Sequence, residues 1–204
     1  MGWNAPFSDA CPMPLSLFPA PRRIRRLVSS LLFASAAALA VPTLASAACP
    51  GADSTPSAQN IAVARTATLC LLNAERKANG LGRLRAHRQL QAAAQTYAGA
   101  MVAGGFFGHV SPTGSTLEQR IRQGTRYLAG ALRYEIGENL AWGQGALASP
   151  RAIVAAWMAS PGHRANILRA AFREIGIGIA PGAPVVGLAG DLAVTYTNEF
   201  GTRR

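Results

Sequence analysis

Two segments in the first half of the chain carry apolar residues at helical spacing. The first starts at Thr55-Pro56, a pair typical of a helix N-cap and first position, and stops at Gly80. The second ends at Gly104-Gly105, and its apolar positions recur every three or four residues: Leu90, Ala93, Ala94, Tyr97, Ala98 and Met101. The pattern predicts two amphipathic helices, each packed on one side against a core.

Shorter helices are predicted in the middle of the chain. Ser115 and Glu118 have the spacing of a capping box, which places a helix start there and an end near Gly124. Ser149-Pro150 is a second cap-and-proline start, and the helix that it opens stops at residues 160–162.

The last third of the chain changes to alternation with a period of two, which indicates strands. Ile175, Ile177 and Ile179 fall on one face, with glycines on the other. Val194 and Tyr196 share a face in a final strand. Helices come first and strands last, so we expect an α+β fold with a small, mainly antiparallel sheet.

The N-terminal region has the features of a secretory signal peptide. Four arginines within residues 22–26 precede an apolar run from Leu27 to Ala47, which closes on the small residues Ala45-Ser46-Ala47. A retained membrane anchor is the alternative, although three serines and Pro42 interrupt the run. We expect a signal peptide with an N-terminal extension, a tether and one domain, at residues 1–47, 48–56 and 57–204. The mature protein is then secreted and lies outside the cell, in the periplasm or at the envelope.

The chain is strongly basic, with 20 Lys and Arg against 9 Asp and Glu, a net charge of +11. Removal of residues 1–47 takes away four arginines and Asp9, which leaves +8. This charge favours contact with anionic surfaces such as phospholipid headgroups or wall polymers, with simple solubility as the alternative. Nucleic acid is not expected as a partner, because the arginines are scattered, no aromatic stripe interleaves them, and export removes the partner.

Two cysteines, Cys49 and Cys70, remain after residues 1–47 are removed. An even number of cysteines in an exported chain indicates a disulfide, which here fastens the tether to the first helix. Two buried free thiols are the alternative.

Three short segments punctuated by glycine contain the candidate chemistry: Phe107-Gly108-His109, Gly137-Glu138-Asn139 and Pro161-Gly162-His163. The chain has only three histidines, and two of them follow a glycine, which lets the backbone approach a cleft closely. In this order, from about Cys70 to Gly201, the segments resemble the CAP superfamily. This group comprises cysteine-rich secretory proteins, antigen five and pathogenesis-related proteins, and the resemblance is closest to its secreted bacterial branch.

The resemblance implies an α-β-α sandwich and a cleft in which His109, Glu138 and His163 meet. Animal and plant members add a second acidic residue between the last two positions, but this chain has no Asp or Glu there. Glu174 is the best candidate to replace it. Supporting roles, through backbone hydrogen bonds, helix capping or charge, are expected of four residues: Asn139, Ser160, Asn166 and Glu174.

Two imidazoles and one carboxylate suit Zn²⁺ or another divalent cation with an open coordination position. Such an ion, held by His109, Glu138 and His163, makes a bound water nucleophilic. The alternative is a polar cluster that only holds the three segments together. Phe106 and Phe107, at the edge of the same cleft, are candidates for contact with an apolar ligand.

Three functions follow from the resemblance, and a binding role is favoured over an enzymatic one. The first is an extracellular or envelope module that binds a lipid or another small apolar or anionic ligand, as family members do. The second is a metal-dependent hydrolase acting on cell-wall or protein substrates. The third is a structural envelope protein with a vestigial cleft. Because the family shares no single reaction, the fold does not decide among them.

Overall fold

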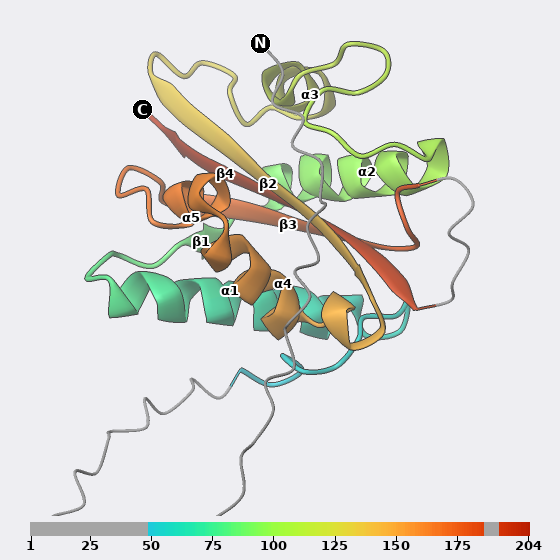
Figure 1. Ribbon diagram of the computed structural model, residues 1–204. Helices are drawn as coiled ribbons and strands as arrows, with labels where there is room; N and C mark the ends of the chain where they lie inside the picture. The colour runs from blue at the N-terminus through green and yellow to red at the C-terminus, as the bar shows by residue number, and fades with distance from the viewer. Residues whose placement is uncertain (1–48, 186–191) are drawn as a thin grey trace, which may run out of the picture. The chain divides into compact units, whose positions relative to one another are not determined.

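A four-stranded sheet lies between two groups of helices in the computed structural model, which describes residues 49–185 and 192–204 (Figure 1). The strands follow the order β1-β3-β4-β2. They are β1 (Arg85–Ala86), β2 (Tyr134–Gln144), β3 (Glu174–Pro181) and β4 (Ala193–Arg203). The helices are α1 (Ile61–Ala78), α2 (Arg88–Gly104), α3 (Leu117–Gly124), α4 (Pro150–Ala159) and α5 (Pro161–Ile167), with a 3-10 turn η1 at Gly145–Ala148.

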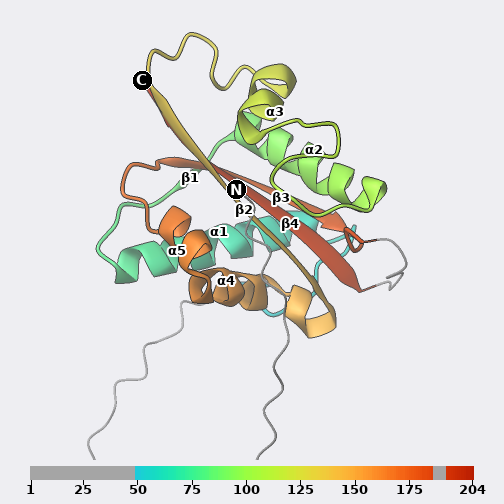
Figure 2. The same ribbon diagram turned by 45° about the horizontal axis from the view of Figure 1, so that its top comes forward.

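Helices α2 and α3 cover one face of the sheet, and α1, α4 and α5 cover the other (Figures 1 and 2). Strand β1 pairs with β3 in parallel, while β3 with β4 and β4 with β2 are antiparallel. The predicted α-β-α sandwich with a mainly antiparallel sheet is therefore confirmed.

The glycines of β3 let α2 lie directly on the sheet. A Cβ added at Gly176 would lie 2.0 Å from the Leu90 carbonyl carbon, and one at Gly178 would lie 2.1 Å from the Ala94 carbonyl oxygen. The intervening isoleucines face the opposite way, into the core beneath α1 and α4. The glycines of β3 thus allow a close contact between the sheet and α2, while its isoleucines fill the core between the sheet and α1 and α4.

The core between the sheet and α1, α4 and α5 is apolar and aromatic. Phe172 and Phe200 stack at 5.5 Å between ring centroids, and Trp157 meets Tyr196 edge to face at 6.2 Å. The Trp157 indole N–H also donates to the Leu140 carbonyl oxygen of β2 at 3.0 Å, so this large side chain is buried without an unpaired donor.

The start of α1 differs from the prediction. The helix begins at Ile61, and Thr55-Pro56 lies in the turns before it. The Thr55 hydroxyl donates to the Gly145 carbonyl oxygen at 2.9 Å, whereas the Asn60 side chain accepts from the Ser57 N–H at 2.6 Å. The Thr55 hydroxyl, which the sequence pattern assigned to helix capping, therefore bonds η1 instead of the start of α1.

The capping box of α3 is shifted by one residue from the prediction. Thr116 is the N-cap, and its hydroxyl accepts from the Gln119 N–H while the Gln119 side chain bonds the Thr116 N–H. Glu118 instead accepts from Arg122 at 2.7 Å and from the Tyr134 hydroxyl at 2.7 Å. Both boxes fit the sequence, and the shifted box frees Glu118 to pair with Arg122.

The predicted disulfide between Cys49 and Cys70 is confirmed. Residues 49–56 form turns, and the Ala52 carbonyl oxygen accepts from the Arg151 N–H of α4 at 2.9 Å. The segment expected to be a tether is thus fastened to α1 and to α4. The predicted signal peptide, residues 1–47, lies outside the described residues. Within the described ranges, no helix is long and apolar enough to cross a membrane.

Candidate functional site

Strand β2 carries the Gly137-Glu138-Asn139 segment, which is part of the sheet and not a loop. Glu138 pairs with Glu199 of β4, and Asn139 pairs with Asn198. Directly opposite residues of antiparallel strands project from the same face. The two glutamates therefore face α2 and α3, and the two asparagines face the other helices.

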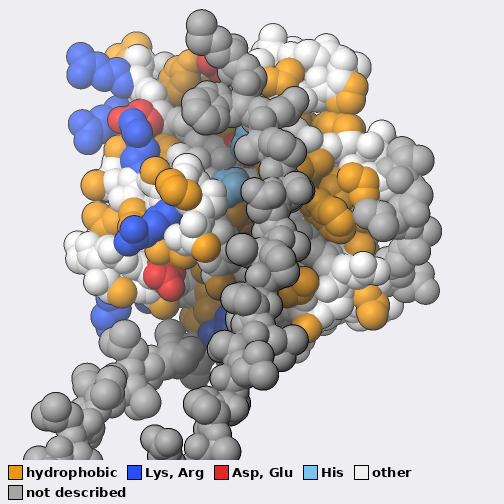
Figure 3. All heavy atoms as spheres, in the orientation of Figure 1, with side chains coloured by type: hydrophobic (Ala, Val, Ile, Leu, Met, Phe, Trp, Pro, Cys, Tyr) orange, Lys and Arg blue, Asp and Glu red, His pale blue; other side chains and the backbone are white. Residues whose placement is uncertain are grey.

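Glu138 and His109 meet on the α2 face. The His109 Nδ1 lies 2.8 Å from Glu138 Oε1, and the two side chains are 58% and 3% exposed, respectively. The carboxylate is thus buried while most of the imidazole remains in contact with solvent. Histidine side chains are visible at the surface in Figure 3. Two members of the expected trio are therefore in direct contact.

The guanidinium of Arg120 on α3 is the second partner of Glu138, and the sequence analysis did not identify it. Its Nη2 lies 2.5 Å from Glu138 Oε2, and its Nη1 donates to the backbone carbonyls of His109 at 3.0 Å and Ser115 at 2.9 Å. Its Cζ also lies 3.4 Å from the Tyr97 ring centroid. Arg120 thereby joins α2, α3, β2 and the His109 loop.

Glu199 takes the place beside Glu138 that Glu174 was expected to fill. Its carboxyl is fully buried, and burial together with the nearby charge of Glu138 raises its pKa well above the usual range. Glu174 lies at the start of β3, where Oε2 accepts from the Tyr127 hydroxyl at 2.8 Å. Glu174 was expected here because no acid lies between Asn139 and His163, whereas strand pairing places Glu199, near the end of the sequence, opposite Glu138.

Strand β4 carries further buried polar side chains in the residues that precede Glu199. Thr195, Thr197, Asn198 and Glu199 are all fully buried. The Thr197 hydroxyl, both amide atoms of Asn198 and both carboxyl oxygens of Glu199 have no hydrogen-bond partner among the described residues. Buried polar atoms in proteins nearly always have a hydrogen-bond partner. These atoms of β4 are therefore unusual, because they could still bond a group that is not among the described residues.

His163 lies on α5, on the opposite face of the sheet from α2. Asn139 Nδ2 donates to the backbone carbonyl of His163 at 3.0 Å. Asn166 Nδ2 donates to the Glu138 carbonyl at 3.1 Å and to Asn139 Oδ1 at 2.9 Å. Burial, and to a lesser degree the charge of His109, lower the pKa of the His163 imidazole. The asparagines therefore tie α5 to β2, with His163 half-buried beside them.

Ser160 occupies the N-cap position of α5, as expected. Its side chain makes no capping hydrogen bond, and its carbonyl oxygen accepts from the Arg164 N–H at 2.9 Å. Pro161 at the first helical position supplies the start signal of this short helix.

The donor set does not fit a divalent metal ion in this arrangement. Within residues 49–185 and 192–204, no three His, Cys, Asp or Glu side chains are grouped so that they could hold one. Both oxygens of Glu138 are already bonded, one to His109 and one to Arg120. A fixed guanidinium beside the carboxylate also repels a second cation. We therefore assign no step to a metal.

An apolar groove opens beside this cluster, between α2, α3 and the loop that carries His109. It has a volume of about 720 Å³, and Arg120 lines it together with α2 residues such as Ala93 and Tyr97. Phe106 also lines the groove and packs edge to face on Tyr97 at 5.9 Å. Phe107 is 46% exposed and lies outside the lining. Of the two phenylalanines expected at a cleft, the structure thus places one in this groove.

Comparison with known proteins gives one family and several relatives. The CAP model, described as the cysteine-rich secretory protein family, matches residues 69–190, more than half of the chain. The uncharacterized protein YkwD of Bacillus subtilis (strain 168) is 38% identical over 109 residues, which cover 53% of this chain and 39% of YkwD.

Solved structures agree with the sandwich fold. An extracellular protein containing a SCP domain from Bacillus anthracis (strain Ames) has a TM-score of 0.51 and 28% identity, covering 65% of this chain and 38% of the other. An outer surface protein from Borrelia burgdorferi has a TM-score of 0.52 at 22% identity, covering 65% of this chain and 87% of the other, and supports the fold alone. The chain therefore spans well under half of its two Bacillus relatives.

Proposed function

This chain belongs to the cysteine-rich secretory protein family, and we propose that it is an exported binding module whose apolar groove holds an amphiphilic ligand. The observation that carries the proposal is the groove of about 720 Å³ between α2 and α3. Pockets of a few hundred to about 1,000 Å³, mostly apolar with a few polar groups, are typical of small-molecule sites. An acyl chain or a sterol-like ring system has the matching chemistry.

Export is supported by three observations. The segment up to Ala47 has the composition of a signal peptide, and the chain contains a disulfide, which forms in oxidising compartments. The B. anthracis relative is described as extracellular. We place the mature protein outside the cytoplasm on these grounds.

The groove has both apolar and polar lining residues, which favours an amphiphile over a purely apolar molecule. Phe106 and the alanines of α2 supply an apolar wall. Ser111, Thr113 and Arg120 supply hydroxyls and a cation. Because Arg120 also bonds Glu138, a polar head placed against it contacts the residue that anchors the His109 loop.

A bulky side chain in the groove tests the proposal. Ala100 lines the groove and is exposed, so Ala100→Trp fills the groove without disturbing the core. Ala103→Trp is the matched control, because Ala103 is exposed on the same helix and lies outside the lining. We expect native mass spectrometry of protein incubated with a long-chain fatty acid to show binding to the parent and to Ala103→Trp, with about tenfold less binding to Ala100→Trp.

Equal binding by all three proteins would place the ligand elsewhere, and no binding by any would remove the groove as a lipid site. The latter result leaves the vestigial cleft of a structural envelope protein as the better description.

A hydrolase is the second candidate, and the His109–Glu138 pair is the observation that favours it. Glu138 holds Nδ1 of an imidazole that is 58% exposed, an arrangement that suits a general base. Ester or peptide hydrolysis that disappears in His109→Ala, with and without added Zn²⁺, would support this candidate over the binding role. The metal-dependent form has less support, since Arg120 and His109 already occupy both Glu138 oxygens.

A further inference from the structure

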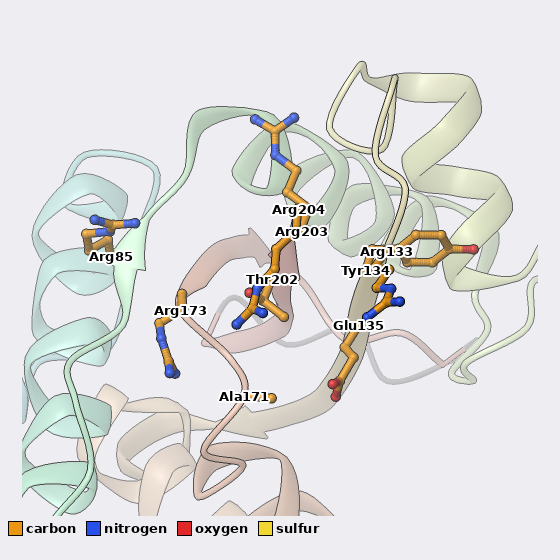
Figure 4. Close-up of a pocket in the computed structure, with 9 residues that line it drawn as sticks. All are labelled: Arg85, Arg133, Tyr134, Glu135, Ala171, Arg173, Thr202, Arg203 and Arg204. Atoms are coloured by element: carbon orange, nitrogen blue, oxygen red, sulfur yellow. The ribbon is translucent and has the colours of Figure 1, made fainter.

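A second hollow lies at the end of the sheet where β2 begins and β4 ends (Figure 4). It has a volume of about 740 Å³, and its lining shares no residue with that of the apolar groove. Five arginines line it: Arg85, Arg133, Arg173, Arg203 and Arg204. Glu135 is the one acidic residue of the lining. In Figure 3, basic side chains gather on the corresponding side of the molecule.

The acidic groups near the hollow are already paired. Glu135 Oε2 accepts from Arg169, which lies outside the lining, at 2.7 Å from Nε and 2.6 Å from Nη2. Arg85 lies 4.0 Å from Glu174, but this carboxylate also accepts the Tyr127 hydroxyl. Among the described residues, the other four lining arginines make no ion pair with an acidic side chain, so most of the positive charge of the hollow is not balanced.

The backbone and one aromatic ring set the positions of these arginines. Arg133, which precedes β2, and Arg204, which follows β4, exchange two backbone hydrogen bonds, at 3.2 and 2.9 Å. Arg173 donates to two backbone carbonyls of its own loop, and the Arg203 guanidinium lies 4.9 Å from the Tyr127 ring centroid. Figure 4 shows Arg173 and Arg203 on separate segments, while Arg204 extends away from both. The cluster is built mainly around Arg133, Arg173 and Arg203.

Like charges brought together in this way repel one another, and a bound anion removes that cost. Guanidinium groups bind phosphate with paired, planar hydrogen bonds that an ammonium group cannot make. We propose that this hollow is a binding site for the phosphate group of an anionic ligand, either a phospholipid headgroup or a soluble phosphate ester. The site is separate from the apolar groove and does not depend on it.

A charge-matched pair of variants tests the site. The double substitution Arg133→Gln and Arg173→Gln removes two lining arginines. The double substitution Arg83→Gln and Arg126→Gln removes the same charge at exposed positions outside the hollow. The probes are glycerol 3-phosphate, measured by calorimetry, and vesicles of phosphatidylglycerol or phosphatidylcholine, measured by sedimentation. All are compared in about 0.15 M salt, where distant surface charges are screened.

We expect the parent and the Arg83/Arg126 variant to bind phosphatidylglycerol vesicles in preference to phosphatidylcholine. The Arg133/Arg173 variant should bind at least about tenfold more weakly, because it loses charge-assisted hydrogen bonds. Matching loss of glycerol 3-phosphate binding identifies a soluble ester as a sufficient ligand, and loss of vesicle binding alone identifies the headgroup. Equal weakening of the two variants, or no binding of either probe, would overturn the proposal. Ala100→Trp should leave both measurements unchanged, which separates this site from the groove.

Discussion

An arginine packs against each face of the sheet, and the two arginines are used differently. Arg76 of α1 is fully buried, and its three nitrogens donate to the carbonyls of Gly82, Ile167, Arg169 and Phe172 at 2.7 to 3.2 Å. The Arg120 side chain of α3 is 11% exposed and bonds a carboxylate and two carbonyls, while its Nε has no partner among the described residues.

We infer that the α1 face serves mainly stability, whereas the α3 face carries the proposed binding site. Arg76 uses every donor nitrogen to connect α1 with two loops, and aromatic residues lie in the same core. Arg120 stands between an open groove and a row of buried polar groups that includes Glu199. Polar groups that are buried but not fully bonded cost stability, so they are expected where a protein binds or reacts rather than where it only folds.

The largest expected effect is the loss of Arg76. Arg76→Met removes a donor from four backbone carbonyls, of which those of Arg169 and Phe172 keep a second donor, the Phe172 N–H and the Arg173 side chain, respectively. We expect the free energy of unfolding to fall by about 3–5 kcal/mol, because the carbonyls of Gly82 and Ile167 lose the Arg76 bond without such a replacement. Urea unfolding at neutral pH, followed by tryptophan fluorescence, measures the change. Arg76→Lys is the control and should retain part of the stability, because an ammonium group still reaches one or two of these carbonyls. A loss below about 1 kcal/mol for Arg76→Met would show that this face does not depend on the arginine.

A smaller effect is expected for Arg120. Arg120→Met leaves the Glu138 carboxylate with His109 as its remaining partner, and should lower the free energy of unfolding by about 1–3 kcal/mol. Arg122→Met, on the same helix but exposed, should cost no more than about 0.5 kcal/mol. Adding Glu138→Gln to Arg120→Met should recover stability, because it removes the unpaired charge. A double variant less stable than Arg120→Met would contradict the pairing.

The smallest effect at mildly acidic pH is the contribution of Glu199. Its pKa is raised in the folded state, so its contribution to stability is fully present below the unfolded pKa near 4.5 and is lost as pH rises through the folded value. Within that window the parent should lose up to about 1.4 kcal/mol per pH unit relative to Glu199→Gln. Unfolding titrations of both proteins from acidic to mildly alkaline pH give this difference, in which titrating groups that do not interact with Glu199 cancel. A difference that does not change with pH would show that Glu199 titrates normally.

Much of the fold could be predicted from local patterns, because the responsible signals are local. The apolar face of α2, the Ser149-Pro150 start of α4 and the isoleucine–glycine alternation of β3 are each contained within a few residues. The start of α1 was misplaced because Thr55 bonds Gly145, 90 residues away. Two overlapping capping boxes at the start of α3 likewise differ only through contacts made elsewhere.

The candidate site was less predictable, since it depends on register and on packing between distant elements. His109 and Glu138 came from short motifs. Glu199 required knowledge that β2 and β4 pair with Glu138 and Glu199 opposite each other. Arg120 required knowledge that α3 folds back over the His109 loop, and one of many arginines cannot be singled out without that contact. The basic hollow gathers residues from four separate segments, so composition predicted the charge but not its location.

The most direct test of the groove is a ¹³C-methyl NMR titration of the protein with a long-chain fatty acid. Binding in the groove predicts shifts concentrated at Ala92, Ala93 and Ala100 of α2 and at nearby residues of the His109 loop, with little change at Ala64 and Ala67 of α1. Shifts centred on α1 and α4, or a spectrum unchanged at saturating ligand, would contradict the assignment of the groove as the ligand site.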